Sequence, residues 1–177
     1  YHAGNTSAPE TDYLMLNTDA GTADLDTLWN DTAPTSAVFS LGTNALVNAS
    51  GDTYVAYVFA PVDGFSRFDS YIANNSADGP FVWCGFKPQF VLTKSTTASR
   101  FWAIYDSGRN QHNVNGLVIS PNATTGDTGT AYASTYGIDM LSNGFKVRTN
   151  SNFVNNGAET YIFAAFGESP FKNSRAR

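Results

Sequence analysis

The chain has 177 residues and a net charge of −5, and charged residues make up only 14% of it. Apart from a short basic stretch at 172–177 it lacks the clustered Lys and Arg that a phosphate backbone requires, so its composition argues against nucleic-acid binding. One cysteine, Cys84, excludes an intrachain disulfide and a cysteine-rich zinc site, and no apolar run approaches the roughly 20 residues of a membrane-spanning helix.

Along the chain, the hydrophobic pattern predicts many short strands and almost no helix. One helical turn is expected within 22–29, and a run of β-branched and aromatic residues predicts a strand at 53–60. Further strands are expected at 81–84, 90–94, 101–105, 117–119, from Phe145, and at 160–166. The dipeptide Asn143-Gly144 is typical of a tight hairpin turn. These features predict an all-β fold, an antiparallel β-sandwich or jelly roll.

Two parts of the chain repeat one another. Residues 39–44 (FSLGTN) match 145–150 (FKVRTN) at an offset of 145 − 39 = 106, and 53–60 (TYVAYVFA) match 160–167 (TYIFAAFG) at 160 − 53 = 107. Two shorter matches keep the same order, namely 1–4 (YHAG) with 105–108 (YDSG) and 14–16 (LML) with 117–119 (LVI). Matches that stay in order over this length indicate an internal duplication.

The duplication predicts the domain organisation. Residues 1–62 are expected to be the C-terminal part of a first repeat, 63–171 a complete second repeat, and 172–177 a basic C-terminal tail. We therefore expect the chain to begin partway through its first repeat. The aromatic residues of the two matched strands are expected to pack in an interior; they are Tyr54, Tyr57, Phe59, Tyr161, Phe163 and Phe166.

The residue types needed for catalysis are scarce. The two histidines, His2 and His112, lie in polar loop sequences, and neither a Gly-X-Ser-X-Gly elbow nor a phosphate-binding glycine loop is present. The three glutamates, Glu10, Glu159 and Glu168, do not form the paired-carboxylate pattern of a glycoside hydrolase. The sequence therefore predicts a protein that is not an enzyme and has no cofactor.

Acidic residues near the first helical turn raise the question of a metal ion. Asp24, Asp26 and Asp31 are close in sequence and could offer oxygen ligands to Ca²⁺. Their spacing matches no EF-hand loop, which requires a glycine at its sixth position and a glutamate at its twelfth. A solvated acidic loop is the alternative interpretation.

The candidate ligand-binding residues are Trp102, Tyr105, Asp106 and Arg109. An aromatic ring beside Asp and Arg can cover the apolar face of a sugar while the polar groups bind its hydroxyls. The alternative is that Trp102 and Tyr105 belong to the core and that Asp106 and Arg109 shape the following turn. The other tryptophans and the cysteine are expected to be core residues; they are Trp29, Trp83 and Cys84.

Several structural motifs resemble a repeat domain of tail-fibre and other virion proteins of marine phages. They are 32–36 (TAPTS), 47–54 (VNASGDTY), 79–81 (GPF), 85–88 (GFKP), 102–106 (WAIYD), 141–146 (LSNGFK) and 160–166 (TYIFAAF). The resemblance covers most of the chain, implies a concanavalin-like jelly roll and a location on the virion surface, and carries no binding residues over.

Three functional hypotheses follow from these observations. The first is a tail-fibre or appendage module that recognises a host-surface glycan and works with other virion proteins as a homo-oligomer, with trimers usual for fibres. The second is a capsid-decorating or purely architectural subunit without a ligand, which predicts large apolar interfaces and no open polar-aromatic pocket. The third is a divergent glycan depolymerase, which requires two carboxylates in one groove. We expect the first, without membrane insertion.

Overall fold

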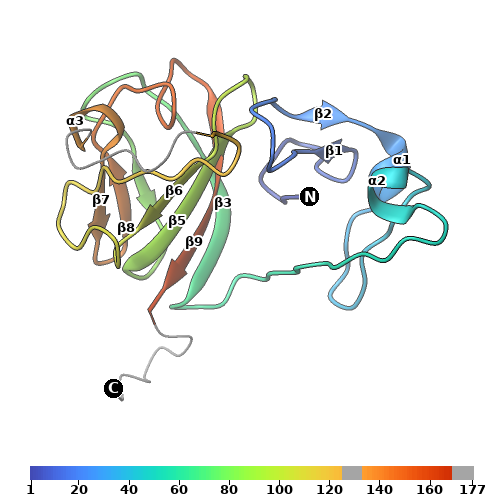
Figure 1. Cartoon of the computed structure of the whole chain (residues 1–177). Coiled ribbons are helices and arrows are strands. Elements are labelled where there is room, and N and C mark those ends of the chain that lie inside the picture. The colour runs from blue at the N-terminus through green and yellow to red at the C-terminus, as the bar shows by residue number, and fades with distance from the viewer. Residues whose placement is uncertain (125–132, 169–177) are drawn as a thin grey trace.

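The computed structural model describes residues 1–124 and 133–168, so the predicted basic tail at 172–177 and the last residues of the second repeat lie outside the described residues. Most of the regular secondary structure in the described residues is strand, and the sheets are antiparallel. The predicted all-β class is therefore confirmed. Figure 1 shows two parts, a β-sandwich built from residues 63–168 and a smaller N-terminal lobe, which we define as residues 1–52.

The sandwich consists of two antiparallel sheets (Figure 1). The first sheet has the order β3-β9-β5-β6, with β3 at Ser66–Ile72, β9 at Thr160–Gly167, β5 at Pro88–Ser95 and β6 at Ala103–Asp106. The second has the order β4-β8-β7, with β4 at Phe81–Trp83, β8 at Gly144–Val147 and β7 at Ile138–Leu141, and a short helix α3 at Ala133–Tyr136 precedes β7. β9 therefore lies between two partners, and its backbone pairs on both edges.

β7 and β8 form a hairpin close to the predicted turn, but its two turn residues are Ser142 and Asn143, one position earlier than predicted, because Leu141 pairs with Gly144. Gly144 also lies against β4, where a Cβ atom would meet the carbonyl oxygen of Val82 at 2.1 Å. No other residue fits this approach without moving the β4 strand.

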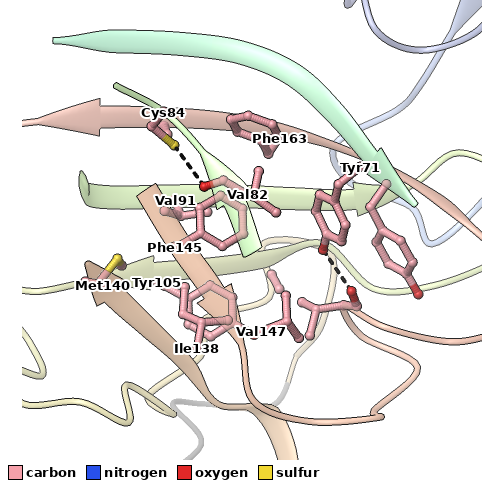
Figure 2. Packing of buried hydrophobic residues seen from close by; sticks show 14 of the residues in the cluster. Tyr71, Val82, Cys84, Val91, Tyr105, Ile138, Met140, Phe145, Val147 and Phe163 are labelled. Carbon is pink, nitrogen blue, oxygen red and sulfur yellow. Dashed lines mark hydrogen bonds between the residues drawn. The ribbon is translucent and has the colours of Figure 1, made fainter. Parts of the chain in front are cut away.

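Aromatic residues fill the space between the sheets (Figure 2). The rings of Tyr71 and Tyr161 stack at 5.4 Å, and those of Phe145 and Phe163 meet edge to face at 5.5 Å. The buried hydroxyl of Tyr71 donates to the carbonyl oxygen of Val154 at 2.8 Å, so its burial leaves no unpaired polar group. The predicted interior positions of Tyr161 and Phe163 are thus confirmed.

The predicted burial of Cys84 is also confirmed. Burial raises the pKa of its thiol to about 12, which keeps it protonated at neutral pH. A protonated thiol is neither a nucleophile nor a metal ligand, so this cysteine behaves as a small apolar residue.

The N-terminal lobe has little core of its own. It contains the strand pair β1 (Asp12–Tyr13) and β2 (Ala23–Asp24) and two single-turn helices, α1 (Asp26–Trp29) and α2 (Ala45–Asn48). α1 lies within the predicted turn at 22–29. Leu28 is the only buried hydrophobic residue among residues 1–62, all of which the structure describes. The predicted core residue Trp29 is half-buried, and its indole N–H donates to the carbonyl oxygen of Asp12 at 3.0 Å.

The lobe is held on the sandwich by polar contacts of its first 22 residues. Lys94 of β5 donates to the carbonyl oxygen of Asp19 at 3.0 Å, and the backbone N–H of Arg100 donates to the same oxygen at 2.9 Å. The N–H of Thr22 donates to the carbonyl oxygen of Thr96 at 2.8 Å. Hydrogen bonds to the sandwich therefore help to fix the conformation of the lobe, which has little apolar packing of its own.

The strand predicted at 53–60 is wrong. These residues form no strand and run as an extended, solvent-exposed stretch from the lobe to β3 (Figure 1). The sequence has the propensity of a strand, but a strand requires a partner for its backbone N–H and C=O groups, and no described segment lies in that position. The predicted strand at 117–119 is reduced to a single bridge between Ile119 and Ile104.

Candidate functional site

The predicted sugar-binding set is not an open platform. Trp102 is only 7% exposed, and its indole N–H donates to the carbonyl oxygen of Met15 at 3.0 Å. Tyr105 is fully buried, with its hydroxyl donating to the carbonyl oxygen of Tyr136 at 2.6 Å, and burial raises its pKa. Neither ring can therefore stack on a sugar. The core alternative is confirmed for both aromatic residues.

The two polar members of that set shape the turn after β6. A side-chain oxygen of Asp106 accepts from the backbone N–H of Gly108 at 2.7 Å, and the backbone N–H of Arg109 donates to the carbonyl oxygen of Asp106 at 3.3 Å. Asp106 and Tyr105 also point to opposite faces of the sheet, since adjacent strand residues alternate. The four residues therefore do not converge on one ligand.

The acidic loop offers no metal centre. Asp24, Asp26 and Asp31 are exposed. Across residues 1–124 and 133–168, no three His, Cys, Asp or Glu side chains gather in a way that could hold a metal ion. The solvated-loop interpretation of these carboxylates is the one that the geometry favours.

Trp83 is not a core residue, and the prediction that it was is wrong. It is 53% exposed, because Val82 and Cys84 take the inward positions of β4 and leave Phe81 and Trp83 on the outside. The guanidinium carbon of Arg67 lies 4.6 Å from the centre of the Trp83 ring, and this guanidinium donates to Asp69 at 2.7 Å. We call these three residues the tryptophan rim: Arg67, Asp69 and Trp83.

A half-open hollow of about 280 Å³ adjoins the rim. Six residues of the 61–67 segment line it, among them Arg67, together with Cys84. The hollow is near the lower limit of the roughly 300 Å³ at which small-molecule sites begin. The tryptophan rim thus places an exposed indole beside an Arg–Asp pair and a small hollow.

The largest anomaly of the described surface is the segment 53–62, which we call the apolar arm. Val55 and Tyr57 are 79% and 83% exposed, and the other large apolar residues of the arm are exposed as well; these are Tyr54, Val58, Phe59 and Val62. Other large apolar residues of the lobe are also exposed, namely Val38, Phe39, Leu41 and Leu46. Exposed apolar surface on this scale is typical of an interface.

The backbone of the arm is unpaired too. Among the described residues, 53–60 make no backbone-to-backbone hydrogen bond, and only the carbonyl oxygen of Ala60 accepts one from a side chain, Ser66 at 3.0 Å. Side-chain contacts also hold the arm in place. The Tyr54 hydroxyl donates to the carbonyl oxygen of Ala45 at 2.6 Å and accepts from the backbone N–H of Ala49 at 2.9 Å. The ring of Phe59 packs at 5.5 Å against Phe166 and at 6.1 Å against Phe68 on the outer face of the first sheet.

Sequence reasoning missed both surfaces for identifiable reasons. Strand alternation in 81–84 was consistent with either face being buried, so the exposure of Trp83 could not be read from it. The high β-propensity of 53–60 predicted an extended backbone, but propensity does not show whether a partner strand is present.

In a comparison with protein families, a family model described as "Domain of unknown function (DUF7483)" matches residues 1–170. No curated protein and no solved structure matches the chain. None of the helices in the described residues is long and apolar enough to cross a membrane. Because the model spans both the N-terminal lobe and the sandwich, the chain belongs to the DUF7483 family.

Proposed function

We propose that this chain is a non-catalytic structural subunit at the surface of a phage virion, of the tail-fibre or appendage kind, and that it joins neighbouring protein through the apolar arm. The observation that carries the proposal is the run of exposed apolar side chains and unpaired backbone at 53–62. The virion location is supported by the resemblance of the repeat motifs, and the assembly role by the arm.

The physical argument is that such a segment is costly in a protein that works alone. Monomeric proteins rarely expose contiguous apolar patches, and an unpaired strand is a template for pairing with another chain. Natural edge strands are protected by charges or proline, whereas 53–60 contains neither. A segment with this composition is suited to burial against other protein, in a homo-oligomer or with another virion subunit.

The pKa of Glu159 argues against this residue as the acid of a glycoside hydrolase. Glu159 is held in an ion pair with Arg100 at 2.7 Å. Burial alone would raise the pKa of Glu159, but hydrogen bonds from Arg100, Asn156 and Ser95 outweigh it and keep the pKa at about 2. A glycoside hydrolase requires a general acid with a raised pKa, so this carboxylate is in the opposite condition.

A second candidate function is recognition of a host-surface glycan at the tryptophan rim. The specific observation in its favour is the exposed Trp83 ring beside Arg67 and Asp69, with a hollow next to it. An indole with adjacent charged groups has the chemistry that binds sugars. The ligand class is thus retained from the first hypothesis, while the residues differ from those predicted.

The assembly proposal is tested by sedimentation velocity of the chain over a range of concentrations. We expect a mass above that of the monomer that falls to the monomer mass in the double variant Val55→Ser/Tyr57→Ser. The matched control is Trp83→Ser, an exposed aromatic outside the arm, which should leave assembly unchanged. Immunogold labelling of particles that encode the chain tests the virion location. A chain that stays monomeric and is missing from purified particles would refute the proposal.

The same proteins separate the two functions on a glycan array. Glycan binding that is lost in Trp83→Ser and retained in the arm variant would establish the rim as a recognition site. An array without any hit for the unmodified chain would remove the second candidate.

A further inference from the structure

The internal repeat identifies what the apolar arm corresponds to. The arm residues 53–60 match β9, the strand at the centre of the first sheet, residue for residue. The environments of the two copies are opposite. Tyr54 is 46% exposed, whereas its match Tyr161 is fully buried. The match of Phe39 is Phe145 of β8, and here too the first is exposed and the second is fully buried.

The difference in burial between the arm and β9 is explained by the strands that lie beside them. β9 pairs with β3 along one edge and with β5 along the other, so that Tyr161 lies opposite both Tyr71 and Ser95. The arm has no strand on either edge. The same local sequence thus forms a central strand where two partners are present and stays unpaired where they are missing.

The arm also shares the low charge of β9. β9 is uncharged over Thr160–Gly167, and the arm is equally uncharged over 53–60. Charges on a strand protect it against pairing with other chains, so the arm lacks this protection.

We propose that the apolar arm is the central strand of a second sandwich, completed by a polypeptide segment patterned like residues 63–104, whose two long strands take the places of β3 and β5. This inference rests on the proposed function, because it names the partner of the assembly interface. Tyr1 matches Tyr105 in the repeat, so a test protein can supply such a segment by fusing it directly before Tyr1.

The repeat also fixes which side chains the partner must meet. Tyr54, Ala56 and Val58 match the inward-facing Tyr161, Phe163 and Ala165. Ala56 is much smaller than Phe163, so the natural partner segment is expected to carry a larger side chain opposite it. Val55, Tyr57 and Phe59 would lie on the outer face of the new sheet.

The test is an extended chain in which a second copy of residues 63–104 precedes Tyr1, so that Ile104 is followed directly by Tyr1. Hydrogen–deuterium exchange of the arm amides is measured in the original and the extended chain. We expect exchange at 54–60 to slow by on the order of 100-fold, toward the rates of the matching amides of β9, because paired central strands open far less often than unpaired segments.

Two further proteins keep the test decisive. An extended chain with Ala56→Phe gives the arm the large inward residue of β9, so that a size mismatch with the borrowed segment cannot mask pairing. The matched control carries Val91→Asp in the added copy only. Val91 is fully buried in β5, so the added strand should fail to pack while the native sandwich is unchanged, and the arm amides should exchange as fast as in the original chain.

The outcomes separate this inference from the proposed function. Fast exchange at 54–60 in both extended chains would overturn the inference, while arm-dependent association of the original chain would leave the assembly role standing. Slow exchange at 54–60 in the original chain at high concentration, equal to that of β9, would identify a second copy as the occupant and would also overturn the inference.

Discussion

Lys94 gives a sharp test of how the N-terminal lobe is attached. Its side chain is buried where the lobe covers β5, and its ammonium group donates to the carbonyl oxygens of Asp19 at 3.0 Å and Ala98 at 3.5 Å. Burial lowers its pKa from 10.5 to about 8, although the nearby carboxylates of Asp19 and Glu159 oppose the shift. The lobe therefore holds this lysine in a form that titrates near neutral pH.

The magnitude follows from linkage. Between about pH 8 and 10.5 the unfolded chain binds a proton at Lys94 that the folded chain does not, so the free energy of unfolding must rise with pH over this window. A lowering from 10.5 to about 8, at 1.36 kcal/mol per pKa unit, sets an upper limit of about 3.4 kcal/mol. Between pH 7.5 and 9.5 we expect a rise of about 1–2 kcal/mol, because this window covers only part of the range between the two pKa values.

The measurement is urea unfolding of the chain and of Lys94→Met at both pH values. Methionine keeps the apolar stem but does not titrate, and the Asp19 carbonyl oxygen retains the N–H of Arg100 at 2.9 Å. The rise should therefore be missing from the variant. Ionisation of tyrosines in the unfolded chain acts equally on both proteins and cancels in their difference. Identical pH dependence in the two proteins would refute the burial of Lys94 under the lobe.

Two substitutions address the sandwich itself. Asn155→Ala should lower the free energy of unfolding by about 3 kcal/mol, because its buried side-chain amide makes four hydrogen bonds to backbone and side-chain atoms. The control is Asn48→Ala, at the exposed position that matches Asn155 in the repeat, which should cost under about 0.5 kcal/mol. Chemical denaturation of both variants checks this difference. Glu159→Gln should cost on the order of 2 kcal/mol at pH 7. Because the folded pKa is lowered to about 2, the original chain loses this advantage as the pH falls from about 4.5 to 2, and stability curves of the two proteins should converge there.

The sequence predicted those strands of the sandwich well whose apolar pattern is uninterrupted. β5 and β9 are rich in apolar and β-branched residues, and both were found with nearly correct bounds. β3 was missed because Arg67 and Asp69 interrupt its alternation. β3 is an edge strand, where a charged side chain can still reach solvent at the border of the sheet. No local sequence pattern shows that a strand lies at an edge.

The candidate site was harder to predict because it depends on long-range context. Trp102 and Trp83 both occur in strand-like runs, yet the first is buried and donates to the Met15 carbonyl oxygen, while the second lies on an edge strand and is exposed. The burial of Trp102 thus involves a segment 87 residues away in sequence. Periodicity within a window of ten residues carries no information on that contact.

The internal repeat allows the effect of long-range contacts to be compared within one molecule. The arm and β9 share a strand-forming sequence, so intrinsic propensity cannot account for the difference between an exposed Tyr57 and the covered β9. The two segments differ in whether flanking strands are present. The hydrogen bonds and apolar contacts of flanking strands contribute more to the stability of a strand than its intrinsic propensity does. A repeat whose central strand is left uncovered can add a neighbouring unit by the same contacts that build its own sandwich. Folding and assembly of this chain would then use one interface, which is a simple physical basis for a fibre of repeated modules.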